Sequence, residues 1–292
     1  MYFLIAFGVI RAIKILVDLR QLKRYKEQRR EPIIAEFFNQ QEFVDSQKYN
    51  AEKLEFSIIH KLFDTAIEVL FWVLFWYVAI WNWTDGLLAS FGLCADKPYV
   101  NDIMQAYIFS ILTTLLESVI NLPFSLYSTF VIEEKYGFNK TTPGTFVCDE
   151  LKKILIVVIL YAVLIPLILW TIEVSGPALV ITLAGVSISV IIILSILVPT
   201  VLLPCFYTFT DLEEGELRTA ILKEAEKTDV SVAEIKVMDG SKRSSHSNAF
   251  VTGFWSFRKV VLFDTLIEQH PIDQVCGVVN HELGHVVHKH TT

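Results

Sequence analysis

The chain has 292 residues, of which 53% are hydrophobic and 20% charged, and its formal net charge is −7. The negative charge argues against a nucleic-acid partner, and four cysteines without CxxC spacing suggest neither a zinc knuckle nor a disulfide framework. The mean hydropathy is +0.48, and the apolar residues come in long runs. These features predict a polytopic membrane protein.

About five apolar segments are candidates for membrane spans. The first, residues 2–17, is interrupted by Arg11 and Lys14 and fits either a span or an interfacial anchor. A basic tract follows it, and the Lys/Arg bias predicts that the loop at residues 19–60 is cytoplasmic. The polar stretch up to about residue 60 is expected to be helical and partly amphipathic. The remaining predicted spans cover approximately residues 66–83, 103–126, 154–171 and 178–203. Alternation across five spans returns the segment after residue 203 to the cytoplasmic side.

The third predicted span contains two polar residues, Glu117 and Asn121. A carboxylate inside a membrane is costly, so Glu117 is a functional candidate. The favoured interpretation is nevertheless that it faces a water-filled interior without a chemical role. Pro123 is expected to kink the end of this span, and residues 127–139 are expected to form an elaborate loop after it.

From residue 204 onward the pattern is that of a small soluble domain. Residues 214–228 have apolar residues at helical spacing, and residues 235–238 fit a strand. Residues 249–255 and 260–263 are predicted to pair as a β-hairpin. Within this part, Cys276 is expected to act as a small hydrophobic residue, as is Cys148 in the membrane part.

Residues 281–285 read His-Glu-Leu-Gly-His, which is the HExxH pattern. Residues four apart lie on one face of an α-helix, so His281 and His285 can direct imidazole nitrogens at one zinc ion. Glu282 lies about 100° away on the helix and is placed to accept a proton from the attacking water. The alternative is two surface histidines on an amphipathic helix, although Gly284 counts slightly against a purely structural helix. An apolar stripe on the opposite side consists of Ile272, Val275, Val279, Leu283 and Val286.

The predicted fold class is therefore an α-helical polytopic membrane protein with a small α+β zincin-like metalloprotease domain. We expect residues 1–203 to form the membrane region and residues 204–292 to form a truncated zinc metalloprotease domain that faces the cytosol.

Four blocks of sequence, in this order along the chain, resemble the type I CAAX prenyl protease family. They are residues 127–139 (YSTFVIEEKYGFN), 240–250 (GSKRSSHSNAF), 260–266 (VVLFDTL) and the HELGH helix. The resemblance implies a helical membrane chamber and a zinc endopeptidase that removes the C-terminal tripeptide from prenylated CAAX proteins, with a second cleavage further upstream. It also implies contact with membrane lipid and a location in the endoplasmic reticulum membrane, or alternatively the inner nuclear membrane.

The resemblance also suggests roles for residues outside the helix. Asn248 and Ala249 match an edge-strand motif to which an extended substrate adds as a further strand. His246 is a candidate for stabilising the oxyanion, with an exposed loop histidine as an equal alternative. Lys242 and Arg243 either meet a substrate carboxylate or solvate a loop, and the second interpretation is favoured.

The third zinc ligand is not found in the sequence. A peptidase site needs three protein ligands and a water, and the family supplies the third as a glutamate on a later helix. The sequence ends at Thr292, so we expect the chain as written to bind its one zinc ion weakly and to be inactive or nearly so. His288 is a conceivable substitute, but the helical rise places it about 10 Å from His281. An incomplete chain or truncated product is the favoured explanation, ahead of a degenerate paralogue.

Two other functions remain as alternatives. The first is a catalytically dead family member or truncated product that acts as a non-enzymatic membrane scaffold. The second, with less support, is a transporter that uses Glu117 and the basic first segment. The transporter alternative leaves the HELGH sequence unexplained.

Overall fold

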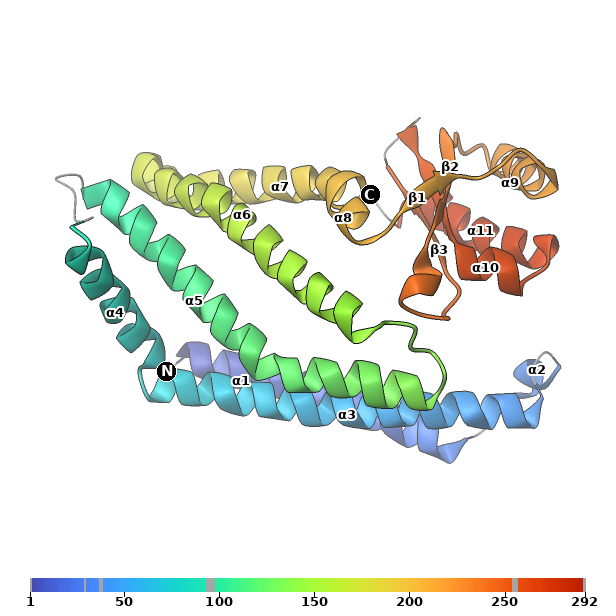
Figure 1. Cartoon of the computed structure of the whole chain (residues 1–292), viewed down its shortest axis with the longest axis horizontal. Helices are drawn as coiled ribbons and strands as arrows, with labels where there is room; N and C mark the ends of the chain where they lie inside the picture. Colours follow the sequence, from blue (N-terminus) through green and yellow to red (C-terminus); the bar gives the residue numbers. More distant parts are fainter. Residues whose placement is uncertain (1, 29, 37–38, 93–97, 254–256, 291–292) are drawn as a thin grey trace. The chain divides into compact units, whose positions relative to one another are not determined.

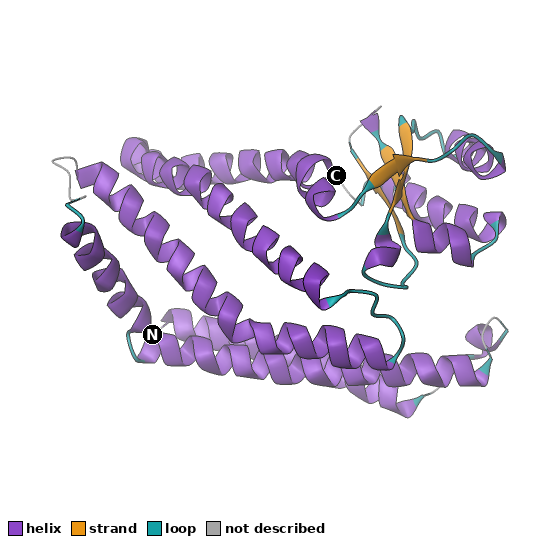
Figure 2. Cartoon of the chain, viewed as in Figure 1, coloured by secondary structure: helices purple, strands orange, loops and turns teal. Residues whose placement is uncertain are grey.

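The structure, a computed structural model, describes the chain except residues 1, 29, 37–38, 93–97, 254–256 and 291–292 (Figure 1). It contains two compact units, Met1–Tyr136 and Gly137–Thr292, and each is described by itself. All described strands belong to the second unit, and the first is helical (Figure 2).

The first unit is built from long helices. α1 packs along α3, and α4 packs against α5. α3 begins with a capping box in which Asn39 and Glu42 satisfy each other's backbone N–H groups. The elements are α1 (Tyr2–Glu27), α2 (Pro32–Ala35), α3 (Gln40–Val73), α4 (Trp76–Ser90), α5 (Pro98–Tyr127) and the π-helical turn η1 (Ser128–Glu133).

The predicted second span, residues 66–83, is not a single helix. α3 ends at Val73, and α4 starts at Trp76 after a bend of 61°. Phe75 between them has a left-handed backbone, with φ 54°. The apolar run continues through this break, so the hydropathy of the sequence does not predict it.

Residues 127–139 were predicted to be a loop, and this prediction is wrong for most of the segment. The helix continues through η1 to residue 135. Tertiary contacts explain this: Tyr49 and Lys53 of α3 donate hydrogen bonds to Glu133 at 2.8 and 2.7 Å, and Ile132 is only 1% exposed. A π-helical turn accommodates the local change in helical register.

The second unit begins with helices that are apolar and largely exposed. α6 starts at its N-cap Thr142 and contacts α7, and Gly176 between them has φ 46°. The elements are α6 (Pro143–Ser175), η2 (Gly176–Ala178), α7 (Leu179–Leu197), η3 (Val198–Leu202) and α8 (Leu203–Phe206).

Length and composition identify two helical stretches among the described residues that can cross a membrane. These are Tyr99–Glu133 and Pro143–Phe206, and the number rises to three if α3 and the bent α4 form one span. Judged by the same length and composition, the described residues of α1 do not form a candidate membrane span. The exposed apolar surface of these helices suits lipid contact.

A four-stranded mixed sheet follows, in the order β1-β2-β4-β3. β2 and β4 are parallel, whereas β1–β2 and β3–β4 are antiparallel. The elements are β1 (Phe209–Asp211), α9 (Glu216–Lys227), β2 (Glu234–Met238), η4 (Gly240–Lys242), β3 (Ala249–Thr252), β4 (Lys259–Phe263), α10 (Asp264–Gln269) and α11 (Ile272–Val287).

The predicted helix at residues 214–228, the strand at 235–238 and the hairpin are confirmed, except that residues 254–256 of the hairpin lie outside the described part. β1, α10 and the parallel pairing were not predicted. Because α6 to α8 belong to the same compact unit as the sheet, a separate domain at residues 204–292 stays a prediction.

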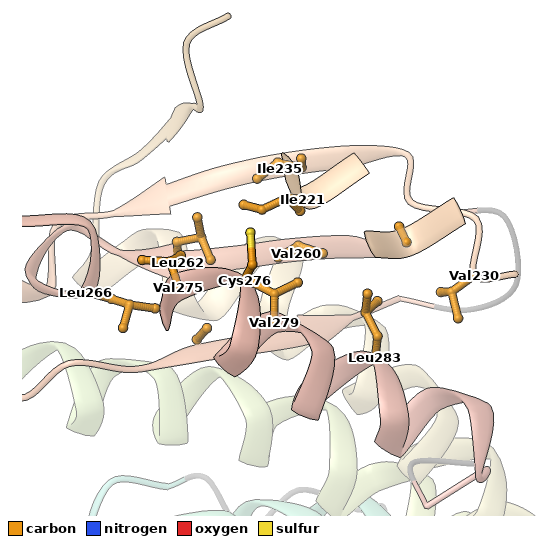
Figure 3. Packing of buried hydrophobic residues seen from close by; sticks show 12 residues of the cluster. Ile221, Val230, Ile235, Val260, Leu262, Leu266, Val275, Cys276, Val279 and Leu283 are labelled. Atoms are coloured by element: carbon orange, nitrogen blue, oxygen red, sulfur yellow. The ribbon is translucent and has the colours of Figure 1, made fainter. Parts of the chain in front are cut away.

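The core of the second unit lies between α9, α11 and the sheet (Figure 3). Cys276 is buried there as expected, whereas Cys148 is exposed. The fully buried side chains of this core, each at most 1% exposed, are Ile221, Ile235, Val260, Leu262, Val275, Val279 and Leu283. This packing holds α11 against the sheet.

Candidate metal centre

The two histidines and the glutamate of the HExxH sequence meet on one side of α11. The candidate ligand atoms of His281, Glu282 and His285 all lie within 4.8 Å of one another. The two imidazole rings are 4.7 Å apart between centroids. This is the result expected for an i, i+4 pair on a regular helix.

The opposite side of α11 carries the predicted apolar stripe. Val275, Val279 and Leu283 are at most 1% exposed, and Ile272 and Val286 pack partly buried against the same core. The helix is therefore held by its apolar face, whose buried side chains point into the core (Figure 3). The candidate metal ligands His281 and His285 lie outside this core.

A hydrogen bond also joins α11 to α9. Asn280, which precedes His281, donates through Nδ2 to Glu224 at 2.9 Å. A hydrogen bond from Lys227, and then the one from Asn280, lower the pKa of Glu224 below its ordinary value. The second helix therefore restrains the backbone immediately before the first histidine.

Two imidazoles and a neighbouring carboxylate are a donor set suited to a divalent transition metal. In the described part of the chain, no further His, Cys, Asp or Glu joins this group. His288, the conceivable substitute ligand, caps the end of α11 and is outside the group.

His290 contacts the second histidine instead. Its Nδ1 lies 2.9 Å from Nδ1 of His285, and its backbone N–H donates to the carbonyl of His285. This hydrogen bond leaves Nε2 of His285 for a metal, an arrangement in which a second residue fixes the orientation of a ligand.

The residues proposed to bind substrate lie at the free edge of the sheet. β3, which starts at Ala249, is an edge strand, and no strand pairs with its outer side among the described residues. β3 contacts α11. The exposed Asn248 precedes it, with its carbonyl accepting from the Phe263 N–H at 3.0 Å. An extended peptide has backbone groups available to pair with here.

His246 is exposed and its ring stacks on Phe138, with 4.1 Å between ring centroids. The carbonyl of His246 accepts a hydrogen bond from Thr265 at 2.9 Å. The ring is therefore oriented by a residue more than a hundred positions earlier in the chain.

The favoured interpretation of Arg243 as a residue that solvates a loop is wrong. Its side chain is 16% exposed, and its guanidinium donates two hydrogen bonds to Asp149, at 2.7 and 2.9 Å. These bonds raise the pKa of Arg243 above its ordinary value. Lys242 is exposed and pairs with Asp239, so the two neighbouring basic residues have different environments.

Two family models together match most of the chain. The model of the CAAX prenyl protease N-terminal region, with five membrane helices, matches residues 21–208, and that of peptidase family M48 matches residues 211–292. The chain belongs to the CAAX prenyl protease family. This confirms the resemblance and the predicted fold class of a polytopic helical membrane protein with a small metalloprotease domain.

Individual members of the CAAX prenyl protease family show how far the similarity extends. The CAAX prenyl protease 1 homolog of Arabidopsis thaliana is 35% identical over 281 residues, covering 94% of this chain and 64% of the relative. The probable CAAX prenyl protease 1 of Schizosaccharomyces pombe is 34% identical over 271 residues, covering 91% and 56%. A crystal structure of S. mikatae Ste24p matches with a TM-score of 0.86 and 29% identity, covering 98% of this chain and 67% of that chain.

The chain thus spans 64% of the length of the Arabidopsis CAAX prenyl protease 1 homolog. Family M48 is a family of metallopeptidases, which agrees with a metal at the His281–Glu282–His285 group. The five membrane helices of the N-terminal family model agree with a multi-pass membrane protein.

Sequence reasoning missed three residues around this site, Phe138, Asp149 and His290. Phe138 lies in the block 127–139 that carried the resemblance, and this was a usable signal. Asp149 is an acidic residue near the start of an apolar helix, and no pattern in the neighbouring sequence indicates that it pairs with Arg243.

Proposed function

We propose that the protein is a membrane-embedded zinc metalloendopeptidase that cleaves the C-terminal tripeptide from prenylated CAAX proteins. The observation that carries this proposal is the His281–Glu282–His285 group, held on the packed helix α11 in a member of the CAAX prenyl protease family. The printed names of the relatives, CAAX prenyl protease 1, support the substrate class.

The residues of α11 have distinct roles in this proposal. His281 and His285 would hold the zinc ion as two of the three protein ligands that such a site needs, and His290 would orient His285 through their shared hydrogen bond. Zinc, when bound, supplies Lewis-acid chemistry that activates water and polarises a carbonyl. Glu282 accepts the proton of the attacking water and passes it to the leaving amide nitrogen.

Substrate binding is assigned to the free edge of the sheet. The peptide extends along β3 from Asn248 and Ala249, and main-chain hydrogen bonds hold it. His246 donates to the carbonyl oxygen as negative charge develops on it. Membrane lipid surrounds the apolar helices, and we assign the protein to the endoplasmic reticulum membrane, with the inner nuclear membrane as the alternative.

The test uses the full-length gene product, purified in lipid nanodiscs. Zinc content and cleavage of a farnesylated CAAX peptide are measured for the wild type and for Glu282→Gln, with the unprenylated peptide as substrate control. We expect Glu282→Gln to keep its zinc and to lose about 10²- to 10⁴-fold in kcat, the contribution of a general base. His281→Ala is expected to lose the zinc itself.

Cleavage by Glu282→Gln at the wild-type rate would contradict the proposed mechanism. A wild-type protein that binds neither zinc nor the prenylated peptide would favour the membrane scaffold instead.

A further inference from the structure

Two segments that are far apart in the chain are joined beside the edge strand. The backbone N–H of Lys140 donates to the carbonyl of Arg243 at 3.1 Å, and the N–H of Ser245 donates to the carbonyl of Phe138 at 3.0 Å. An isolated antiparallel bridge lies between these two bonds. Residues 137–142, which lead into α6, therefore form a short ladder with residues 243–245, which lead toward β3.

The side chain of Arg243 strengthens this junction. Its Nε and Nη2 donate to the two carboxylate oxygens of Asp149, in the second turn of α6, and both side chains are at most 16% exposed. The guanidinium also lies 4.6 Å from the ring centre of Tyr207. A bidentate pair fixes direction as well as distance, because both donors must align with both acceptors.

The same loop is restrained on its other side by α10 and its preceding strand. Thr265 donates to the carbonyl of His246, and Phe263 N–H donates to the carbonyl of Asn248. The segment that leads into β3 is thus hydrogen-bonded at Arg243, at His246 and at Asn248.

We propose that Asp149 and Arg243 form a positioning pair that holds the edge strand β3 ready for the substrate peptide. This inference rests on the proposed endopeptidase function and assigns it two residues that do not touch the metal group. If the pair is broken, residues 243–250 become less ordered in the free protein. Ordering them when the peptide binds then costs free energy, and this weakens peptide binding. KM should therefore rise while kcat for the bound peptide changes little.

The test compares Asp149→Asn and Arg243→Lys with the matched control Lys242→Ala, in the full-length protein loaded with zinc. Lys242 is adjacent to Arg243, but its side chain is 63% exposed. We expect Asp149→Asn to raise KM by about tenfold or more, the effect of one lost charge-assisted hydrogen bond, with kcat within threefold. Arg243→Lys keeps the positive charge but not the two parallel N–H donors of the guanidinium, so it should raise KM by less. Lys242→Ala should leave KM unchanged.

Amide hydrogen exchange gives a readout that does not depend on activity. Asp149→Asn should accelerate exchange in residues 243–250 by about tenfold while leaving the central strand β4 protected. Lys242→Ala should leave both regions unchanged. Faster exchange in β4 would instead indicate general unfolding and would overturn a positioning role.

The outcomes separate this inference from the proposed function. If the wild type cleaves and Asp149→Asn keeps both its KM and its exchange pattern, the positioning role is wrong and the endopeptidase proposal stands. If the wild type does not cleave the prenylated peptide, the proposed function and the substrate role fail together, and the exchange measurement still decides whether the pair orders the loop.

Discussion

The packing of α11 against the sheet can be tested with two identical substitutions on one helix. Val279 is 0% exposed in the core, whereas Val287 at the end of the same helix is 48% exposed. Val→Ala removes two methyl groups in each case, and any gain in helix propensity favours the interior position Val279, which opposes the predicted loss there. A larger loss of stability in Val279→Ala than in Val287→Ala therefore reports on burial.

The magnitude follows from the buried volume that is lost. Two buried methyl groups contribute about 1.6 kcal/mol of transfer free energy, and an incompletely collapsed cavity brings the total to about 2 kcal/mol. Hydrogen exchange of β4 is the assay, because this strand is paired on both sides, with β2 and β3, and its amides exchange only when the unit opens. A loss of 2 kcal/mol corresponds to roughly 30-fold faster exchange for Val279→Ala.

Val287→Ala should exchange within about threefold of the wild type, since surface substitutions usually change stability by less than 0.5 kcal/mol. Equal acceleration by both substitutions, or by neither, would show that burial on this face of α11 does not stabilise the unit.

Three further predictions concern the surroundings of the metal group. A Cβ at Gly240 would lie 2.6 Å from the ring of Phe263, so Gly240→Ala should lower the free energy of unfolding by about 1–3 kcal/mol, measured by β4 exchange. His290→Ala should weaken zinc binding by about 10- to 100-fold in metal titrations, because His285 loses its orienting partner. Glu224 has a lowered pKa in the folded state, so its stabilising contribution is complete above its ordinary pKa of 4.5 and is lost as the pH falls through the lowered folded value. Exchange measured from pH 6 to pH 3 should show a smaller loss of stability in Glu224→Gln than in the wild type.

Each of these predictions has an outcome that contradicts it. Wild-type stability of Gly240→Ala would mean that the neighbouring ring moves without cost. Unchanged zinc affinity of His290→Ala would remove this histidine from the metal site. Identical acid sensitivity of Glu224→Gln and the wild type would show that the hydrogen bonds from Lys227 and Asn280 do not couple this carboxylate to folding.

The sequence by itself determined the features that depend on local periodicity. His281 and His285 meet because residues four apart share a helix face, whatever the rest of the chain does. The apolar stripe with Val279 at its centre marked the buried face in the same way. Long apolar runs indicated membrane helices, and alternation with turn residues indicated the β3–β4 hairpin.

Only the tertiary structure decided the features that depend on partners distant in sequence. Asp149 and Arg243 are 94 residues apart, and the sequence around either residue does not indicate that the two side chains pair. The helical form of residues 128–135 depends on contacts of Glu133 with α3, and the parallel pairing of β2 with β4 depends on where β3 is placed. Periodicity reports which face of an element is apolar, whereas a side chain's partner is set by the packing of whole elements. The candidate metal ligands were therefore visible in the sequence, but the residues proposed to position the substrate strand were not.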